Sequence, residues 1–203
     1  MKILSNHRYA LVTGIVLAVI LAFVIDGVVF DRVAFHSLGL ARWTHIVAGV
    51  FWIGLLYYFN VAQIPGLAAA ATDKGGPGGA GIAKYIAPRA LLWFRWGAVA
   101  TWLTGMWYLG SRGATASALT LGHGGQDYYG LVIGLGAWLG TIMLFNVWVL
   151  IWPNQKKVLG LVTATDEEKA KARRVAMLAS RTNFVLSIPM LLCMGSASHG
   201  LPL

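Results

Sequence analysis

Five histidines are the side chains in this sequence best suited to chemistry: His7, His36, His45, His123 and His199. A neutral imidazole is a common protein ligand for the iron of a non-covalently held haem, or for copper. The single cysteine, Cys193, excludes an intrachain disulfide, a zinc site built from several thiolates and a CxxCH motif for covalent haem attachment. No nucleophile–base arrangement, pair of carboxylates or phosphate-binding loop is evident, so redox chemistry is the class to pursue and catalytic residues stay unknown.

The elements that must position these histidines are membrane-spanning helices. The 203 residues are 58% hydrophobic and 11% charged, whereas about a quarter of a typical soluble domain is charged. Apolar runs of about 20 residues, the length that crosses a bilayer, predict five spans, listed by residue number as 9–30, 41–63, 88–110, 128–152 and 182–200. We therefore expect one all-α domain over residues 1–203, an integral membrane bundle of about five transmembrane helices.

Two segments between the predicted spans differ in character. Residues 64–87 are rich in alanine and glycine and are expected to form a flexible connector. By contrast, Thr165 to Glu168 has the pattern of a capping box, so a helix is predicted to begin there and to continue into the fifth span, with Pro189 as a kink.

The basic residues predict the orientation, because Lys and Arg near the ends of spans are retained on the cytoplasmic side. With the N-terminus inside, the cytoplasmic segments carry Lys2, Arg8, Lys74, Lys84, Arg89, Lys156, Lys157, Lys169, Lys171, Arg173, Arg174 and Arg181, and the opposite side carries Arg32, Arg42 and Arg112. The N-terminus is therefore predicted to be cytoplasmic and the C-terminus periplasmic. The net charge of +9 then indicates attraction to anionic membrane lipid, and no nucleic-acid partner is expected.

This topology sorts the histidines by membrane face, since all except His7 fall at the outer side. Two histidines on different helices at equal depth can hold a haem between them, and His45 and His199 are the pair placed on predicted spans. We expect them to ligate the iron of a haem b, with His123, in an outer loop, as an alternative ligand. An alternative without a cofactor stays open, in which the interfacial histidines form hydrogen bonds only with lipid headgroups or with the backbone.

Four further residues complete the predicted site. Arg42 and Arg112 are placed to neutralise haem propionates at the outer surface, and Asp26 to orient an imidazole through its second nitrogen. Gly49, one turn from His45, either opens space for a flat macrocycle or allows a neighbouring helix to approach closely.

Within the third span, Arg95 either extends towards the inner surface or takes part in a buried polar contact, with Asn60, Gln63 and Asn146 at similar depth.

Three sequence blocks are more particular than membrane hydropathy requires. The first runs from His45 through Gly49 and Trp52 to Asn60, the second is Ile-Trp-Pro-Asn-Gln-Lys-Lys-Val at 151–158, and the third runs from Ser180-Arg-Thr-Asn through Ser187-Ile-Pro-Met to Ser198-His199. In this order they resemble the N-terminal membrane domain of the bacterial membrane-bound urate oxidases, some of which are fused to a C-terminal cytochrome c. The present sequence ends soon after His199, so we expect a shorter relative without the cytochrome domain.

The resemblance implies a multi-pass redox domain in the bacterial inner (cytoplasmic) membrane that passes electrons to a c-type cytochrome. It carries over His45 and His199 as functional histidines, and Asn60, Arg181 and Asn183 as recurring polar positions. We consider three hypotheses for the function. The first is an electron-relaying haem b subunit, the second is a domain that oxidises urate or a similar small molecule, and the third is a cofactor-free accessory subunit that only binds other subunits of a membrane complex.

Overall fold

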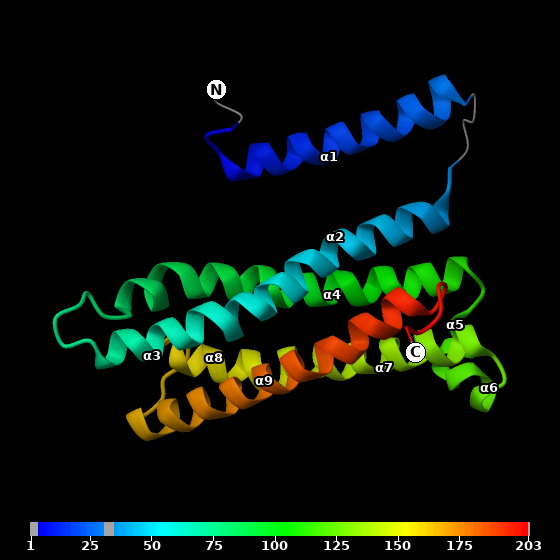
Figure 1. Cartoon of the computed structure of the whole chain (residues 1–203). Helices are drawn as coiled ribbons and strands as arrows, with labels where there is room; N and C mark the ends of the chain where they lie inside the picture. Colours follow the sequence, from blue (N-terminus) through cyan, green and yellow to red (C-terminus); the bar gives the residue numbers. More distant parts are fainter. Residues whose placement is uncertain (1–3, 31–34, 203) are drawn as a thin grey trace. The chain divides into compact units, whose positions relative to one another are not determined.

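A computed structural model describes residues 4–30 and 35–202, and within these residues the secondary structure is helical with no β-strand. The prediction of an all-α fold is therefore confirmed. The chain divides into two compact units, the first ending at His36 and the second beginning at Ser37. Figure 1 shows the elements of both in sequence colours.

The first unit is one helix, formed by α1 (His7–Phe23) and the wider π-helical segment η1 (Val24–Val29). Asn6 caps its start, because the Asn6 side chain accepts a hydrogen bond of 2.9 Å from the Arg8 amide. None of the residues in α1 or η1 is buried. A helix that is apolar on every side is suited to lipid rather than to water.

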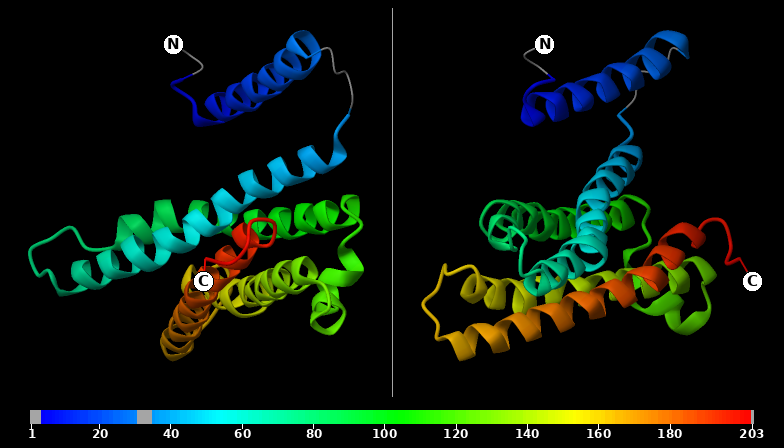
Figure 2. Two further views of the ribbon diagram at one scale, coloured as in Figure 1. Left: turned by 45° about the vertical axis from the view of Figure 1, so that its right-hand side comes forward. Right: turned by 60° about the vertical axis from the view of Figure 1, so that its left-hand side comes forward.

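The second unit is built on four long helical segments, which the views in Figures 1 and 2 show running alongside one another. The first is α2 (Ser37–Tyr57), extended by η2 (Tyr58–Gln63) and α3 (Ile64–Thr72), and the second is η3 (Ile82–Ile86) with α4 (Ala87–Ser111). The third is α7 (Tyr128–Phe145), η4 (Asn146–Ile151) and α8 (Trp152–Val158), and the fourth is α9 (Asp166–Ser196). Helix α2 packs mainly against α4, and α7 against α9, while the short α5 (Thr115–Leu119) and α6 (Leu121–Gly125) pack against α7.

Each of the three π-helical segments in this unit is followed, two residues after its end, by a proline: Pro65, Pro88 and Pro153. Proline has no N–H, and its ring collides with the carbonyl four residues earlier in a regular α-helix. In each case that carbonyl lies inside the π-helical segment, whose wider turn relieves the collision. The helix thus continues through all three prolines, and residues 64–72, predicted as part of a flexible connector, are helical.

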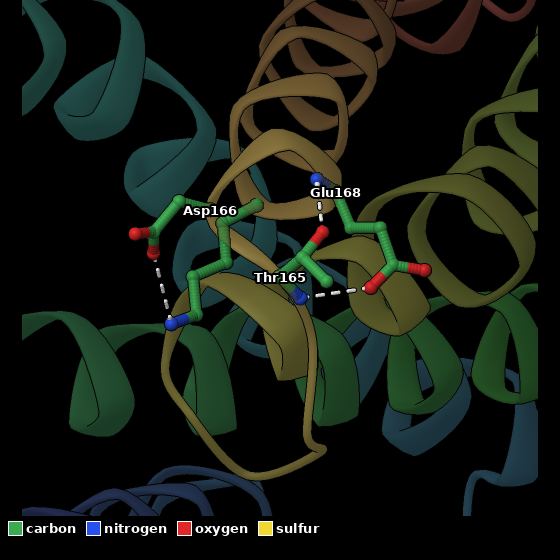
Figure 3. A network of polar contacts seen from close by, with 4 residues as sticks. Thr165, Asp166 and Glu168 are labelled. Carbon is green, nitrogen blue, oxygen red and sulfur yellow. Dashed lines mark hydrogen bonds and ion pairs between the residues drawn. The ribbon is translucent and has the colours of Figure 1, made fainter.

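The start of α9 agrees with the sequence prediction. The Thr165 amide donates to Glu168 Oε2 at 2.8 Å, and the Glu168 amide donates to Thr165 Oγ1 at 3.2 Å, which completes the capping box drawn in Figure 3. Lys169 forms a 3.5 Å ion pair with Asp166 in the first turn. The helix contains Pro189 and ends at Ser196, before the predicted end of the fifth span.

Within residues 4–30 and 35–202, four helical segments are long and apolar enough to cross a membrane: His7–Val29, Ser37–Thr72, Tyr128–Val158 and Asp166–Ser196. The third predicted span, 88–110, corresponds to α4, which is 25 residues long but carries Arg89, Arg95 and four tryptophans and does not fall in this group. The core of the second unit includes Trp52, Leu56, Phe94, Met143 and Val147.

Candidate functional site

The second unit contains a partly open cavity of about 590 Å³ between α2, α4, α7 and α9. This volume falls in the range of small-molecule sites, roughly 300–1,000 Å³. The walls are mainly apolar, and of the histidines in the described residues only His45 lines them. One end of the cavity carries Arg42 from α2 and Ser198 from the turn after α9. Because the four helices come from separate parts of the chain, the cavity depends on the packing of the whole unit.

His45 is half-buried and is held by a backbone carbonyl. Its Nδ1 lies 2.8 Å from the carbonyl oxygen of Thr101 on α4. Since a carbonyl oxygen only accepts hydrogen bonds, Nδ1 carries the proton and donates it, which leaves Nε2 of the neutral ring as a lone-pair donor. Among the residues that the structure describes, no hydrogen-bond partner is found for Nε2. A histidine oriented through one nitrogen, with the other free, has the arrangement of a metal-ligating imidazole.

Gly105 makes this position of the ring possible. A Cβ atom at residue 105 would lie 3.0 Å from His45 Cε1 and 3.1 Å from His45 Nδ1, closer than the 3.5–4.0 Å of ordinary carbon contacts. The prediction singled out Gly49 instead. Gly49 does line the cavity, but a Cβ there would meet only Thr101 Cγ2, at an ordinary 3.8 Å. Gly105 lies one helical turn after Thr101, so the sequence already places the two residues on the same face of α4. Only the packing of α4 against α2 shows that this face meets His45.

The two predicted arginines lie at different distances from the cavity. Arg42 is exposed and lines it directly. Arg112 does not line it, but its guanidinium lies 4.2 Å from the ring centroid of Tyr129, which does. This end of the unit is also tied together by Trp107, which donates to Ser37 Oγ at 3.1 Å. Asp26, the predicted orienter of an imidazole, belongs to the first unit.

The other two predicted ligands, His199 and His123, are exposed and do not line the cavity. His199 follows the end of α9 in a turn, where its amide donates to the Ser196 carbonyl at 3.1 Å, and is not on the helix as expected. His123 sits in an unusual left-handed turn in which all five residues from Leu121 to Gly125 have positive φ, 53° at His123 itself. Among the described residues, no group of three or more His, Cys, Asp or Glu side chains could hold a metal ion. The pairing of His45 with His199 stays a prediction.

A short hydrogen bond fixes the loop before α7. The Ser117 hydroxyl donates to Asp127 Oδ2 at 2.5 Å. This hydrogen bond, joined by backbone amides of the first turn of α7, holds the pKa of Asp127 below its usual value, because each donor favours the charged carboxylate. The carboxylate therefore anchors this loop at neutral pH.

Deeper in the unit, two of the three amides predicted near Arg95, Asn60 and Asn146, bond to α9 and not to the arginine. Asn183, which is fully buried, donates to the Met143 carbonyl at 2.9 Å and accepts from Asn146 at 2.8 Å. Asn60 donates to Ser180 Oγ at 3.0 Å. Arg95 instead stacks its guanidinium 3.8 Å from the ring centroid of Trp152, a cation–π contact.

Comparison with known proteins finds one similarity, which covers part of this unit. Residues 127–202 match the family model described as urate oxidase N-terminal. No curated protein and no solved structure matches the chain. The matched segment runs from the residue before α7 to the turn after α9 and so supplies two of the four helices around the cavity. The resemblance inferred from the sequence is confirmed over residues 127–202, which contain the second and third of its sequence blocks and are similar to the urate oxidase N-terminal family, whereas the His45 block lies outside the matched residues.

Proposed function

We propose that the second unit is a membrane redox subunit that holds a b-type haem in this cavity, with His45 Nε2 as an iron ligand. The observation that carries the proposal is the His45 ring, oriented by the Thr101 carbonyl at 2.8 Å while its other nitrogen is unpartnered beside a cavity of about 590 Å³. When bound, a haem supplies one-electron transfer, so the subunit would relay single electrons.

The residues around the cavity fit such a group. The apolar walls suit a flat hydrophobic macrocycle and exclude water from it, and Arg42 offers a guanidinium to propionate carboxylates, for which a bidentate pair is the favoured geometry. The Thr101 carbonyl fixes the tautomer of His45 and makes Nε2 a stronger electron-pair donor. Arg112 lies behind Tyr129 and contributes positive charge from outside the cavity.

The proposed setting is the bacterial inner membrane, with the Arg42 end of the cavity facing the periplasm. This orientation brings the cavity towards a c-type cytochrome or another subunit of a membrane complex as electron partner. The basic residues at the opposite end of the bundle, which include Lys156 and Lys157 in the last turn of α8, are then available to anionic lipid.

The test is a visible spectrum of the full chain purified in mild detergent, both as isolated and after addition of hemin. We expect a Soret band and a reduced-minus-oxidised α band typical of haem b in the wild type, and loss of both in His45→Ala. Asn60→Ala, which alters a polar residue outside the cavity lining, is the control and is expected to keep the spectrum. A protein without haem after hemin addition would exclude the proposal and favour the cofactor-free accessory subunit.

A second candidate function, oxidation of urate or a similar small molecule, is supported by the family match over residues 127–202. Arg42 is a positive group beside the cavity that suits an anionic substrate. This function predicts that membranes containing the protein reduce added cytochrome c when urate is supplied. Saturating urate without cytochrome c reduction, in membranes whose haem responds to dithionite, would reject the enzyme and retain the relay.

A further inference from the structure

An open groove of about 500 Å³ lies between α4 and the helix formed by α7 and η4. Aromatic side chains dominate its lining, which includes Trp96 from α4 and Phe145 from α7, 54% and 56% exposed, and Trp148 from η4. Two polar groups in the lining satisfy each other, because the Trp102 indole N–H donates to Thr141 Oγ1 at 3.0 Å. The groove therefore suits a long apolar occupant such as a lipid acyl chain.

The seam between α4 and the helix facing it leads from this groove to a pair of cations. Three contacts mark the seam: Trp102 with Thr141 at 3.0 Å, Trp96 with Trp148 at 5.4 Å between ring centroids, and the Arg95 guanidinium at 3.8 Å from the ring centroid of Trp152. Residue numbers fall on α4 as they rise on the opposite helix, so the two run antiparallel. The groove is therefore continuous at one end with the contact between Arg95 and Trp152.

A second cation shares the same indole ring. Lys156 Nζ lies 6.0 Å from the Trp152 ring centroid, so the two positive groups are at most about 10 Å apart. Both side chains are partly buried. In the part of the chain that the structure describes, the one ion pair is that of Lys169 with Asp166, so Arg95 and Lys156 are left without an acidic partner.

Two unpaired cations at the end of an apolar groove match an anionic phospholipid, which has a phosphate at one end and acyl chains at the other. A guanidinium stacked by its face keeps its N–H edge free for the oxygens of a phosphate. Basic pockets between transmembrane helices on the cytoplasmic side bind acidic headgroups, and the Lys156 end of the bundle is the one proposed to face the cytoplasm.

We propose that this groove is a specific site for one anionic phospholipid, with the phosphate held by Arg95 and Lys156 and an acyl chain lying along Trp96, Phe145 and Trp148. A helix of another subunit would also fill the groove, but it would need an acidic side chain facing Arg95, and such side chains are rare in transmembrane segments. The lipid site is independent of the proposed haem.

The experiment is native mass spectrometry of the full chain in mild detergent, titrated with equimolar dioleoyl phosphatidylglycerol and dioleoyl phosphatidylcholine. We expect one phosphatidylglycerol per chain, retained in preference to phosphatidylcholine. Arg95→Gln and Lys156→Gln are each expected to weaken its binding about five-fold. Val99→Phe, which adds bulk to the lining of the groove without changing the charge, is expected to weaken it as well.

Lys157→Gln is the matched control. It removes an equal charge from the neighbouring residue, which lies near enough to Glu168 to favour its carboxylate charge, and it is expected to keep the lipid. An equal loss in Lys157→Gln would mean general attraction to a basic surface, and equal binding of the two lipids, or displacement by inorganic phosphate, would also overturn the site. Thermal unfolding without lipid checks that each variant is folded, and if Arg95→Gln is not, Lys156→Gln decides.

Discussion

The substitution that most directly probes the site is Gly105→Ala. The new Cβ would lie 3.0 Å from His45 Cε1 and 3.1 Å from His45 Nδ1, about 0.4–1 Å short of ordinary contact distances. If the ring retreats by that amount, the 2.8 Å bond from Nδ1 to the Thr101 carbonyl lengthens to about 3.2–3.8 Å, at or beyond the limit of a hydrogen bond.

The loss of this hydrogen bond should produce a measurable change in haem affinity. A neutral hydrogen bond contributes about 0.5–1.5 kcal/mol, so we expect haem affinity to fall by a factor of roughly 2–13. The same substitution replaces glycine by alanine within a helix, which favours folding by up to about 1 kcal/mol. Gly105→Ala is therefore expected to weaken haem binding while leaving the unfolding temperature unchanged or raised.

The assay is a hemin titration followed at the Soret band, with thermal unfolding of the same samples in detergent. Gly54→Ala and Gly140→Ala are matched controls, because both glycines line the cavity and a Cβ at either would meet nothing within 4 Å. Equal hemin affinity for Gly105→Ala and the two controls would refute the claim that Gly105 positions His45. A parallel fall of affinity and unfolding temperature would show general damage to the fold instead.

Three further predictions concern the scaffold. Asn183→Ala removes two buried hydrogen bonds and leaves Asn146 without its partner, so the free energy of unfolding should fall by about 1–3 kcal/mol. A double-mutant cycle with Asn146→Ala should give a coupling energy of about 0.6 kcal/mol, and zero coupling would contradict the pairing. Ser117→Ala should return the pKa of Asp127 towards its usual value. Because the pKa of Asp127 is lowered in the folded state, the stabilisation that the variant loses is present above the ordinary Asp pKa of about 3.9 and disappears as the pH falls through the folded-state pKa. The melting curves of the wild type and the variant should therefore differ at pH 7 and converge in acid. Thr165→Ala removes the N-terminal cap of α9 and should cost about 1 kcal/mol, seen as a lower unfolding temperature that Thr165→Ser restores.

The parts of the fold that depend on local sequence were predictable. The third apolar run was predicted as a helix over 88–110 and forms α4 over Ala87–Ser111, and the capping box at Thr165 is present as expected. The π-helical segments were not predicted, because hydropathy does not register the position of a proline relative to the carbonyl four residues before it. Hydrophobic periodicity also does not fix how each helix is rotated about its own axis within the bundle. It therefore could not show that His45 would face Thr101, or that Gly105 would leave room for the ring.

The two lines of evidence for function lie on opposite sides of the same cavity. His45, Thr101 and Gly105, which carry the haem proposal, belong to α2 and α4 and precede the segment that matches the urate oxidase N-terminal family. Met190 and Met194, which line the cavity from α9, belong to the matched segment. A change confined to the α2–α4 side, such as His45→Ala, therefore tests haem binding without altering any residue of the family match. If this variant loses haem but still reduces cytochrome c with urate, the chemistry resides in the α7–α9 side and the haem is not its carrier. If both activities disappear together, electrons from the substrate pass through the group that His45 holds.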